Sequence, residues 1–252
     1  MKTAIVTGAS SGLGIEFVNS IIRQRPEIEK IWVIARRPER LETLVKTYGD
    51  RIVPFCLDLT DDSSLEEYEK KIKADDPEIC LLVNNAGSGT LGDLRDMDPA
   101  VQGRMVDLNV KAVTVLTTIT LKYMKKGAVI INTCSIASFA PNPRMTVYCS
   151  TKAFILSFSK SLRFEEKKNG INVLAVCPGP MDTEFLPIAG IEKGSSHTFD
   201  TLPRCDPANV ADTAIKKAYK GVGVYTPKIF YKFYRIVAKI LPHGIVMKMS
   251  KA

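Results

Sequence analysis

The 252-residue sequence predicts a single α/β domain, a doubly wound parallel sheet with helices on both faces. Three observations support this prediction. Short apolar runs end in small or polar residues, as strands do where the chain leaves a sheet. A glycine-rich turn joins the first of these runs to an amphipathic segment. In addition, 45% of the residues are hydrophobic and no repeat or low-complexity linker divides the chain, so one core is expected.

The first predicted unit is a strand, a glycine turn and a helix. Residues 4–6 are apolar, and residues 15–22 repeat apolar side chains at helical spacing. Between them, Gly8, Gly12 and Gly14 have the spacing Gly-x-x-x-Gly-x-Gly. Glycines allow the backbone to approach a phosphate closely, and the free amides at the start of a helix attract anions. We therefore expect a phosphate-binding turn here.

The same turn fits a second pattern, the Gly-x-Ser-x-Gly of hydrolase nucleophiles, with Ser10 at its centre. A hydrolase of this kind needs a histidine base, and the chain has two histidines, His197 and His243. The motif also follows the first strand, before a sheet has been built. We therefore favour the phosphate-binding interpretation.

The second strand, 30–35, ends at a pair of arginines, Arg36 and Arg37. In βαβ units that bind NAD, an acidic residue near this point holds the ribose 2′-hydroxyl, whereas an arginine suits the 2′-phosphate of NADP. A guanidinium can bind phosphate through two hydrogen bonds. We expect Arg36 to contact this phosphate with help from Arg37 and Ser10, and Arg40 to lie at the surface. The alternative is that the two arginines are solvated residues at a helix start.

Four further apolar runs predict strands that end in polar or small residues. They are 52–57 before Asp58, 79–83 before Asn84, 128–134 before Ser135, and 171–177 before Pro178. In doubly wound folds, ligands bind at the carboxyl ends of the strands. We therefore expect these strand ends to surround one binding site.

The segment 145–160 lacks proline and glycine and has apolar residues at helical spacing, which predicts a buried helix. Tyr148 and Lys152 lie four residues apart and therefore share a face of this helix. An ammonium about 4 Å from the phenol would lower the pKa of Tyr148 from ~10 toward ~7, which suits an acid or base. Ser135 could hydrogen-bond the substrate oxygen whose proton Tyr148 gives or takes.

Together these motifs resemble those of the short-chain dehydrogenase/reductase family, in its subgroup of about 250 residues. The matching features, in the family's order and at its intervals, are TGASSGLG at 7–14, Asp58, NNAG at 84–87, Asn109, Ser135, Tyr148, Lys152 and PGPMDT at 178–183. The resemblance covers 2–180 well and the rest in outline. It implies a Rossmann-type fold and an NADP(H)-dependent oxidoreductase that interconverts a carbonyl and a secondary alcohol.

The resemblance implies catalytic roles for four residues. Tyr148 would donate or accept the proton, Lys152 would lower its pKa and hold the nicotinamide ribose, and Ser135 would stabilise the substrate carbonyl. Asn109 would hold a water in the proton relay. Alternatively, Asn109 is a helix-interior residue that bonds a neighbouring carbonyl.

The resemblance also implies a cofactor site for NADP(H), while the six cysteines show no metal-binding spacing, so no metal site is expected. The residues it assigns to the cofactor are Gly8, Ser10, Ser11, Gly12, Leu13, Gly14, Arg36, Arg37, Asp58, Leu59, Asn85, Ala86, Gly87, Tyr148, Lys152, Pro178, Gly179, Met181 and Thr183. Asp58 would contact the adenine amine, or else cap the helix that begins near Asp62. Thr183 would help orient the nicotinamide carboxamide, or else cap the next helix. We expect Asn84 to be structural.

Residues 181–206 are expected to form a substrate lid over the core formed by 1–180. This stretch carries Phe185, Leu186, Ile188, Ile191, Phe199 and Leu202, and the loop before Tyr148 adds Phe139, Pro141, Met145 and Val147. An apolar lining favours a lipophilic small-molecule substrate such as a steroid, fatty-acyl or aromatic ketone. Ordinary lid packing is the alternative for these side chains. The alternative for the whole protein is a non-catalytic NADPH-binding sensor or scaffold.

The net charge of +8 comes from the C-terminal end, because 216–252 holds nine of the 35 Lys and Arg and none of the 27 Asp and Glu. Within 226–252 we expect a basic amphipathic helix. Its basic face carries Lys228, Lys232, Arg235 and Lys239, and its other face carries Ile229, Phe230, Phe233, Ile236, Val237 and Ile240. We expect it to pack on the domain, the substrate site or a partner subunit. The alternative is peripheral contact with an anionic membrane. No nucleic-acid partner is expected, because no nucleic-acid module accompanies the charge.

The remaining features concern location and assembly. The first strand starts near residue 2 and no apolar run reaches ~20 residues, so we expect neither a signal peptide nor a membrane span. Cys56, Cys80, Cys134 and Cys177 lie in apolar strands and are expected to be buried thiols. This cysteine usage favours the cytoplasm. By analogy with the family, a homodimer or homotetramer is expected.

Overall fold

The structure is a computed structural model that describes residues 1–191, 194 and 197–249. Within these residues, seven strands form one parallel sheet in the order β3-β2-β1-β4-β5-β6-β7. The strands are β1 (Lys2–Thr7), β2 (Lys30–Ala35), β3 (Ile52–Cys56), β4 (Glu78–Asn84), β5 (Met124–Thr133), β6 (Asn172–Val176) and β7 (Val224–Tyr225). The order runs outward in both directions from the pair β1 and β4, which makes the sheet doubly wound.

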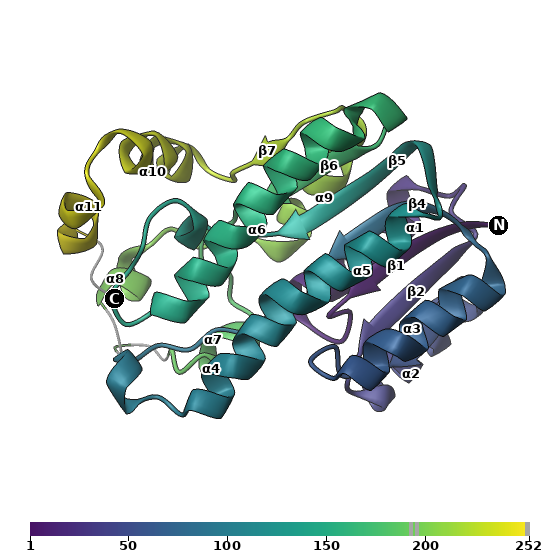
Figure 1. The fold of residues 1–252 in the computed structure, drawn as a ribbon, viewed down its shortest axis with the longest axis horizontal. Coiled ribbons are helices and arrows are strands. Elements are labelled where there is room, and N and C mark those ends of the chain that lie inside the picture. Colours follow the sequence, from purple (N-terminus) through teal and green to yellow (C-terminus); the bar gives the residue numbers. More distant parts are fainter. Residues whose placement is uncertain (192–193, 195–196, 250–252) are drawn as a thin grey trace.

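Helices cover both faces of this sheet (Figure 1). On one face lie α1 (Gly12–Gln24), α2 (Pro38–Tyr48) and α9 (Pro207–Tyr219), and on the other α3 (Asp62–Asp75), α5 (Ala112–Leu121) and α6 (Thr146–Glu165). Alternate strand residues point to opposite faces, so that Ile5 joins one core cluster while Ala4 and Val6 join the other. The predicted fold class is confirmed.

Shorter elements complete the chain. They are α4 (Pro99–Val106), α7 (Phe185–Ile188), α8 (His197–Thr201), α10 (Ile229–Ile240), α11 (His243–Met249), the π-helical turn η3 (Asp107–Lys111), and the 3₁₀ turns η1 (Gly49–Arg51), η2 (Leu94–Asp96), η4 (Ile136–Ser138) and η5 (Glu166–Asn169). Local sequence explains several of the starts. Asp98 and Asp206 accept hydrogen bonds at the N-termini of α4 and α9, and a proline follows each of them.

The structure agrees with the six predicted strands and adds β7, which is only two residues long. One burial prediction is wrong, because Cys56 is exposed. It ends β3, the edge strand of the sheet, where the alternating side chains of the strand are only partly covered. Cys80 is half-buried, while Cys134 and Cys177 are buried as expected.

The predicted C-terminal helix is present as α10, and α11 follows it without having been expected. Helix α10 ends at Ile240, two residues before Pro242, and Gly244 lies inside α11. Positions 192–193 and 195–196 of the predicted lid, and 250–252 of the predicted tail, lie outside the described residues. No helix in the described part of the chain is long and apolar enough to cross a membrane.

A buried polar network joins the sheet to the helices of one face. The Asn84 side chain donates to Thr117 Oγ1 at 2.9 Å and to Asn132 Oδ1 at 2.8 Å. Asn132 in turn donates to Ser159 Oγ at 2.9 Å. This network links β4 and β5 to α5 and α6, so Asn84 is structural, as expected.

Candidate functional site

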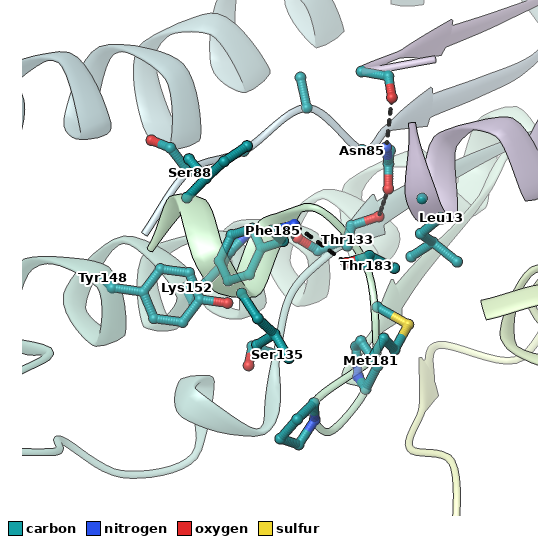
Figure 2. Close-up of a pocket in the computed structure, with 18 of the residues that line it drawn as sticks. Leu13, Asn85, Ser88, Thr133, Ser135, Tyr148, Lys152, Met181, Thr183 and Phe185 are labelled. Carbon is teal, nitrogen blue, oxygen red and sulfur yellow. Dashed lines mark hydrogen bonds between the residues drawn. The ribbon is translucent and has the colours of Figure 1, made fainter. Parts of the chain in front are cut away.

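A cavity of about 580 Å³ lies at the carboxyl ends of the strands. The residues that follow each of the first six strands contribute to its wall: Gly8, Arg36, Leu57, Asn85, Cys134 and Pro178. Figure 2 shows this arrangement, with Asn85, Thr133 and Ser135 at strand ends and Tyr148 and Lys152 on α6. Every residue predicted for catalysis or the cofactor lines the cavity except Gly14 and Asn109.

The glycine turn leaves room for a ligand but not for side chains. A Cβ on Gly14 would lie 2.0 Å from the carbonyl oxygen of Gly8, so Gly14 serves the turn itself. Helix α1 begins at Gly12, and Ser11 at its N-cap makes no side-chain capping bond within the described structure. The Gly14 amide donates to the Ser11 carbonyl at 3.1 Å, which leaves the first two amides of α1 in the described structure available to an anion such as a phosphate.

Hydrogen bonds hold the strand ends around the cavity in register. The Thr7 hydroxyl oxygen accepts from the amides of Asn85 and Ala86, both at 3.0 Å. The Asn85 side chain donates to the Thr7 carbonyl at 3.1 Å and accepts from the Thr133 hydroxyl at 3.3 Å (Figure 2). Asn85 thus ties β1, β4 and β5 together in the cavity wall.

Tyr148, Lys152 and Ser135 all reach the cavity (Figure 2). Lys152 is 5% exposed, and its ammonium donates to the Thr133 carbonyl at 2.8 Å. The same nitrogen lies 5.8 Å from the centre of the Tyr148 ring. The ring centre of Phe185, on α7, is also 5.8 Å from that of Tyr148. The tyrosine is therefore enclosed between α6 and α7.

The predicted low pKa of Tyr148 is wrong for this structure. Burial raises the pKa of Tyr148 to about 12, and the nearby Ser135 hydroxyl offsets this only in part. Burial also lowers the pKa of Lys152, because a desolvated ammonium is disfavoured. The Lys152 nitrogen donates to the Thr133 carbonyl and lies 5.8 Å from the centre of the Tyr148 ring. Desolvation of the phenolate therefore dominates.

Asn109 lies behind the wall, in the π-helical turn η3, and is 1% exposed. Its amide nitrogen donates to the Ser88 carbonyl at 2.9 Å and to Thr151 Oγ1 at 3.0 Å, while its oxygen accepts from the Ser88 amide at 3.0 Å. This matches the alternative in which Asn109 bonds a neighbouring carbonyl. Its side chain positions Ser88, a wall residue that sequence reasoning missed.

The Arg36 side chain lines the cavity and is largely exposed. Its Nη1 atom lies 3.7 Å from Asp58 Oδ2. Asp58 Oδ1 also accepts from the amide and the hydroxyl of Thr60, at 3.0 and 2.8 Å. Burial alone would raise the pKa of Asp58, but the Thr60 bonds and the Arg36 charge together lower it. Because Asp61 is the N-cap of α3, the alternative role of Asp58 as that cap is wrong.

Arg37 is held more tightly than Arg36. Its guanidinium donates to Ser10 Oγ at 3.1 Å and lies 2.9 Å from a carboxylate oxygen of Glu184. Arg40 was expected to be a simple surface residue, but its Nη2 atom forms a second ion pair with Glu184, 3.2 Å from Oε1. The hydrogen bond from Arg37 lowers the pKa of Glu184. Sequence reasoning missed Glu184 in the wall, although it directly follows the PGPMDT motif.

The other end of the cavity is apolar. All six lid residues expected to line it do so, together with Met145 from the preceding loop. Phe139, Pro141 and Val147 do not line it, which corrects that part of the prediction. The Phe139 ring instead packs near the ring of Tyr234, and the two ring centres are 6.3 Å apart. Thr183 lines the wall and also accepts weakly from the Phe185 amide at the start of α7.

Helix α10 supplies a wall that local sequence did not reveal. Phe230, Tyr231 and Tyr234 line the cavity, and Tyr231 is fully buried. Its hydroxyl donates to the Pro203 carbonyl at 2.7 Å, and a Cβ on Gly179 would lie 2.2 Å from its ring. The sequence offered one indication of this wall, the expectation that the basic C-terminal helix packs on the domain, the substrate site or a partner subunit.

Comparisons with known proteins identify relatives of this chain. A family model described as short chain dehydrogenase matches residues 2–189. A short chain dehydrogenase of Pseudocercospora fijiensis is 32% identical over 204 residues, which cover 78% of this chain and 65% of that protein's length.

Two solved structures extend the likeness to nearly the whole chain. A short-chain dehydrogenase from Sphingobium yanoikuyae in complex with NADPH is 26% identical, with a TM-score of 0.78 over 97% of this chain and 98% of that one. The bulky-bulky ketone specific alcohol dehydrogenase from Comamonas testosteroni is 27% identical, with a TM-score of 0.76 over 100% of this chain and 95% of that one. The chain therefore belongs to the short-chain dehydrogenase/reductase family, oxidoreductases with a nucleotide-binding Rossmann-type fold.

Proposed function

We propose that this protein is an NADP(H)-dependent oxidoreductase that interconverts a lipophilic carbonyl and the corresponding secondary alcohol. One observation carries the proposal: Ser135, Tyr148 and Lys152 line the same cavity as the glycine turn and Arg37. The cavity thus holds a proton donor beside a phosphate-binding turn. A non-catalytic sensor would have no need of this arrangement.

The residues present fit a dinucleotide. The amides at the start of α1 suit its pyrophosphate. Arg36 and Arg37, with Ser10, offer hydrogen-bond donors to a 2′-phosphate. The Glu184 carboxylate already pairs with the Arg37 guanidinium, as the phosphate anion would. When bound, the reduced nicotinamide would supply a hydride to the carbonyl carbon.

The protein's own residues would handle the substrate oxygen. Ser135 would donate a hydrogen bond to it, and Tyr148 would transfer its phenolic proton to it as hydride reaches the carbon. A phenol with a raised pKa is protonated at neutral pH, so this site is ready to act as an acid. Lys152, held by the Thr133 carbonyl, would place its charge beside the resulting phenolate.

An apolar substrate is supported by the side chains around Tyr148. Phe185, Leu186, Ile191, Phe199 and Met145 line the cavity at this end. Such a lining would exclude water and accept a bulky hydrophobic group. The Comamonas testosteroni protein, which is specific for bulky-bulky ketones, is a structural relative of the same kind.

A carbonyl panel assayed with NADPH and with NADH tests the proposal. We expect ketone-dependent oxidation of NADPH, fastest for aromatic or long-chain ketones and slower with NADH. Fluorescence titration of the cofactor runs beside it. Tight NADPH binding without turnover of any ketone or alcohol would favour the sensor alternative instead.

A further inference from the structure

Helix α10 turns an apolar row toward solvent. Ile229, Phe233, Ile236 and Ile240 follow the spacing i, i+4, i+7, i+11, which places them along one side of the helix. Their exposed fractions are 82%, 65%, 57% and 74%. The apolar face that the sequence led us to pack against the domain is therefore the outer face.

The opposite side of α10 holds the helix on the domain. Tyr231 is fully buried and bonded to the Pro203 carbonyl, and Ala238 packs in a small cluster with Ala140 and Val246. These contacts fix the rotation of the helix about its axis. The exposed row is thus a consequence of how α10 is anchored, and a large apolar patch of this kind marks an interaction site.

The charge beside the row has one sign. Lys232 and Lys239 are exposed and lie along one flank of it by helical spacing, and the exposed Lys228 directly precedes the helix. The segment 216–252 contains nine Lys and Arg and no Asp or Glu. A helix of this composition lies flat in the headgroup region of an anionic bilayer, with its apolar side down and its lysines on the lipid phosphates.

A second copy of the chain fits this surface less well. In a two-fold contact through α10, the lysines of one copy would meet those of the other, and the segment has no carboxylate to separate them. An anionic membrane provides the complementary charge. It also matches the one-sided arrangement, in which only the outer face of α10 is apolar and exposed.

The helix also borders the cavity. Phe230 lines the cavity and is 52% exposed, and Ile188 on the lid lines it and is 71% exposed. Figure 1 places α10 and α11 (yellow) together at the end of the molecule far from the N-terminus. A bilayer under α10 would therefore lie beside the apolar end of the cavity. Entry of a lipophilic substrate by this route rests on the proposed function, whereas binding to the membrane does not.

We propose that α10 docks the protein on the surface of an anionic phospholipid bilayer. The side chains of Ile229, Phe233, Ile236 and Ile240 enter the headgroup region, and the neighbouring lysines contact lipid phosphates.

Co-sedimentation of the full chain with vesicles tests this proposal without any measurement of turnover. One vesicle preparation is phosphatidylcholine alone, and the other contains phosphatidylglycerol as well. We expect the protein to pellet with the anionic vesicles and about tenfold less with the neutral ones. The double variant Phe233→Gln/Ile236→Gln should lower partition by about tenfold or more, and Lys232→Glu/Lys239→Glu should abolish the preference for phosphatidylglycerol.

Leu94→Gln/Val101→Gln is the matched control, because both are exposed apolar residues outside α6 and α10, 49% and 45% accessible. It should bind vesicles like the unaltered protein, and circular dichroism should give the same melting curve for all variants. Failure of the unaltered protein to pellet with anionic vesicles would overturn the proposal. Light scattering could also overturn it, by finding a dimer that Phe233→Gln/Ile236→Gln converts to monomer. The exposed row of α10 would then be covered by a second copy of the chain and not by a membrane.

Discussion

At the scale of single residues, the environment of Tyr148 decides what it can do. Burial between α6 and the lid raises its pKa to about 12, so the phenol keeps its proton across the neutral range. In the proposed carbonyl reduction this is the form that would act, because the tyrosine would donate its proton. In alcohol oxidation the phenolate would be needed, and the same burial disfavours it. At neutral pH the phenol is therefore in the form that reduction would use, and only a small fraction is in the form that oxidation would use.

Replacement of Tyr148 by phenylalanine should remove the proton donor while keeping the ring against Phe185. Turnover should fall by roughly 10²–10⁴, and NADPH affinity should change by less than about twofold. Steady-state kinetics and cofactor titration measure the two effects. Tyr48→Phe is a control, since that hydroxyl bonds Asn19 outside the cavity. Unchanged turnover in Tyr148→Phe would contradict the assignment.

The pH dependence follows from the direction of this pKa shift. Because reduction needs the protonated phenol, its kcat/KM should stay nearly constant from about pH 6 to about pH 10 and fall only above that range. Because oxidation needs the phenolate, its kcat/KM should rise by about tenfold per pH unit over the same range. Profiles measured in both directions test this. A plateau in oxidation already reached near pH 7 would mean that Tyr148 ionises more easily.

We expect cofactor preference to depend on the arginines after β2. Arg36→Ala and Arg37→Ala should each weaken NADPH by about tenfold or more while changing NADH by less than about threefold, because only NADPH carries the 2′-phosphate. Calorimetric titration with both cofactors measures the difference. Arg40→Ala is the control, since Arg40 does not line the cavity. Equal losses for both cofactors would refute the 2′-phosphate assignment.

At the scale of elements, the site is assembled by packing between parts of the chain far apart in sequence. The loop after β6 presents Gly179 directly to the ring of Tyr231 on α10, where a Cβ would lie 2.2 Å from the ring. The ring in turn closes one wall of the cavity. Glu184, at the start of α7, connects the lid to Arg37 and Arg40 at the other wall. The cavity therefore depends on how α7 and α10 dock.

Gly179→Ala should test the docking of α10. The added methyl group would overlap the Tyr231 ring, and we expect a loss of about 1–3 kcal/mol in the free energy of unfolding. Urea denaturation measures it, and Gly103→Ala, where an added Cβ meets nothing within 4 Å, is the control. In the background Tyr231→Ala, the cost of Gly179→Ala should largely disappear. An equal cost in both backgrounds would mean that the ring is not the obstacle.

At the scale of the whole molecule, the excess positive charge and the exposed phenylalanines of α6 lie on different elements. The excess of positive charge belongs to the segment that contains α10 and α11, whereas the rest of the chain is nearly neutral. The long helix α6 lies elsewhere and exposes two phenylalanines, Phe154 at 44% and Phe164 at 83%. Membrane docking through α10 and self-association through α6 could therefore coexist.

The expected homodimer or homotetramer remains a prediction, and α6 is where we place its interface. Light scattering coupled to gel filtration should give a mass at least twice that of the chain. Phe154→Asp should shift this toward the monomer, because it would bury an unpaired charge in an apolar contact. A monomer at all concentrations in the unaltered protein would rule the assembly out.

Much of the fold was predictable because strands and helices leave periodic patterns in local sequence. The runs at 30–35 and 79–83 correspond to buried strands β2 and β4, and the Tyr148–Lys152 helix is α6. The residues after the strands could be placed at one site, since parallel strands bring their carboxyl ends to the same edge. By contrast, β7, two residues long, has no period to detect.

The sequence by itself determined the fold class, the glycine turn and the set of residues that gather at the strand ends. Only the tertiary structure decided that Glu184 pairs with Arg37, that Asn109 serves Ser88, that Tyr148 has a raised pKa, and that α10 turns its apolar row outward. The physical reason is that burial, ion pairing and the rotation of a docked helix arise from contacts between distant segments. Local periodicity records which face of α10 is apolar, but contacts with distant residues such as Gly179, Pro203 and Ala140 determine which face is covered.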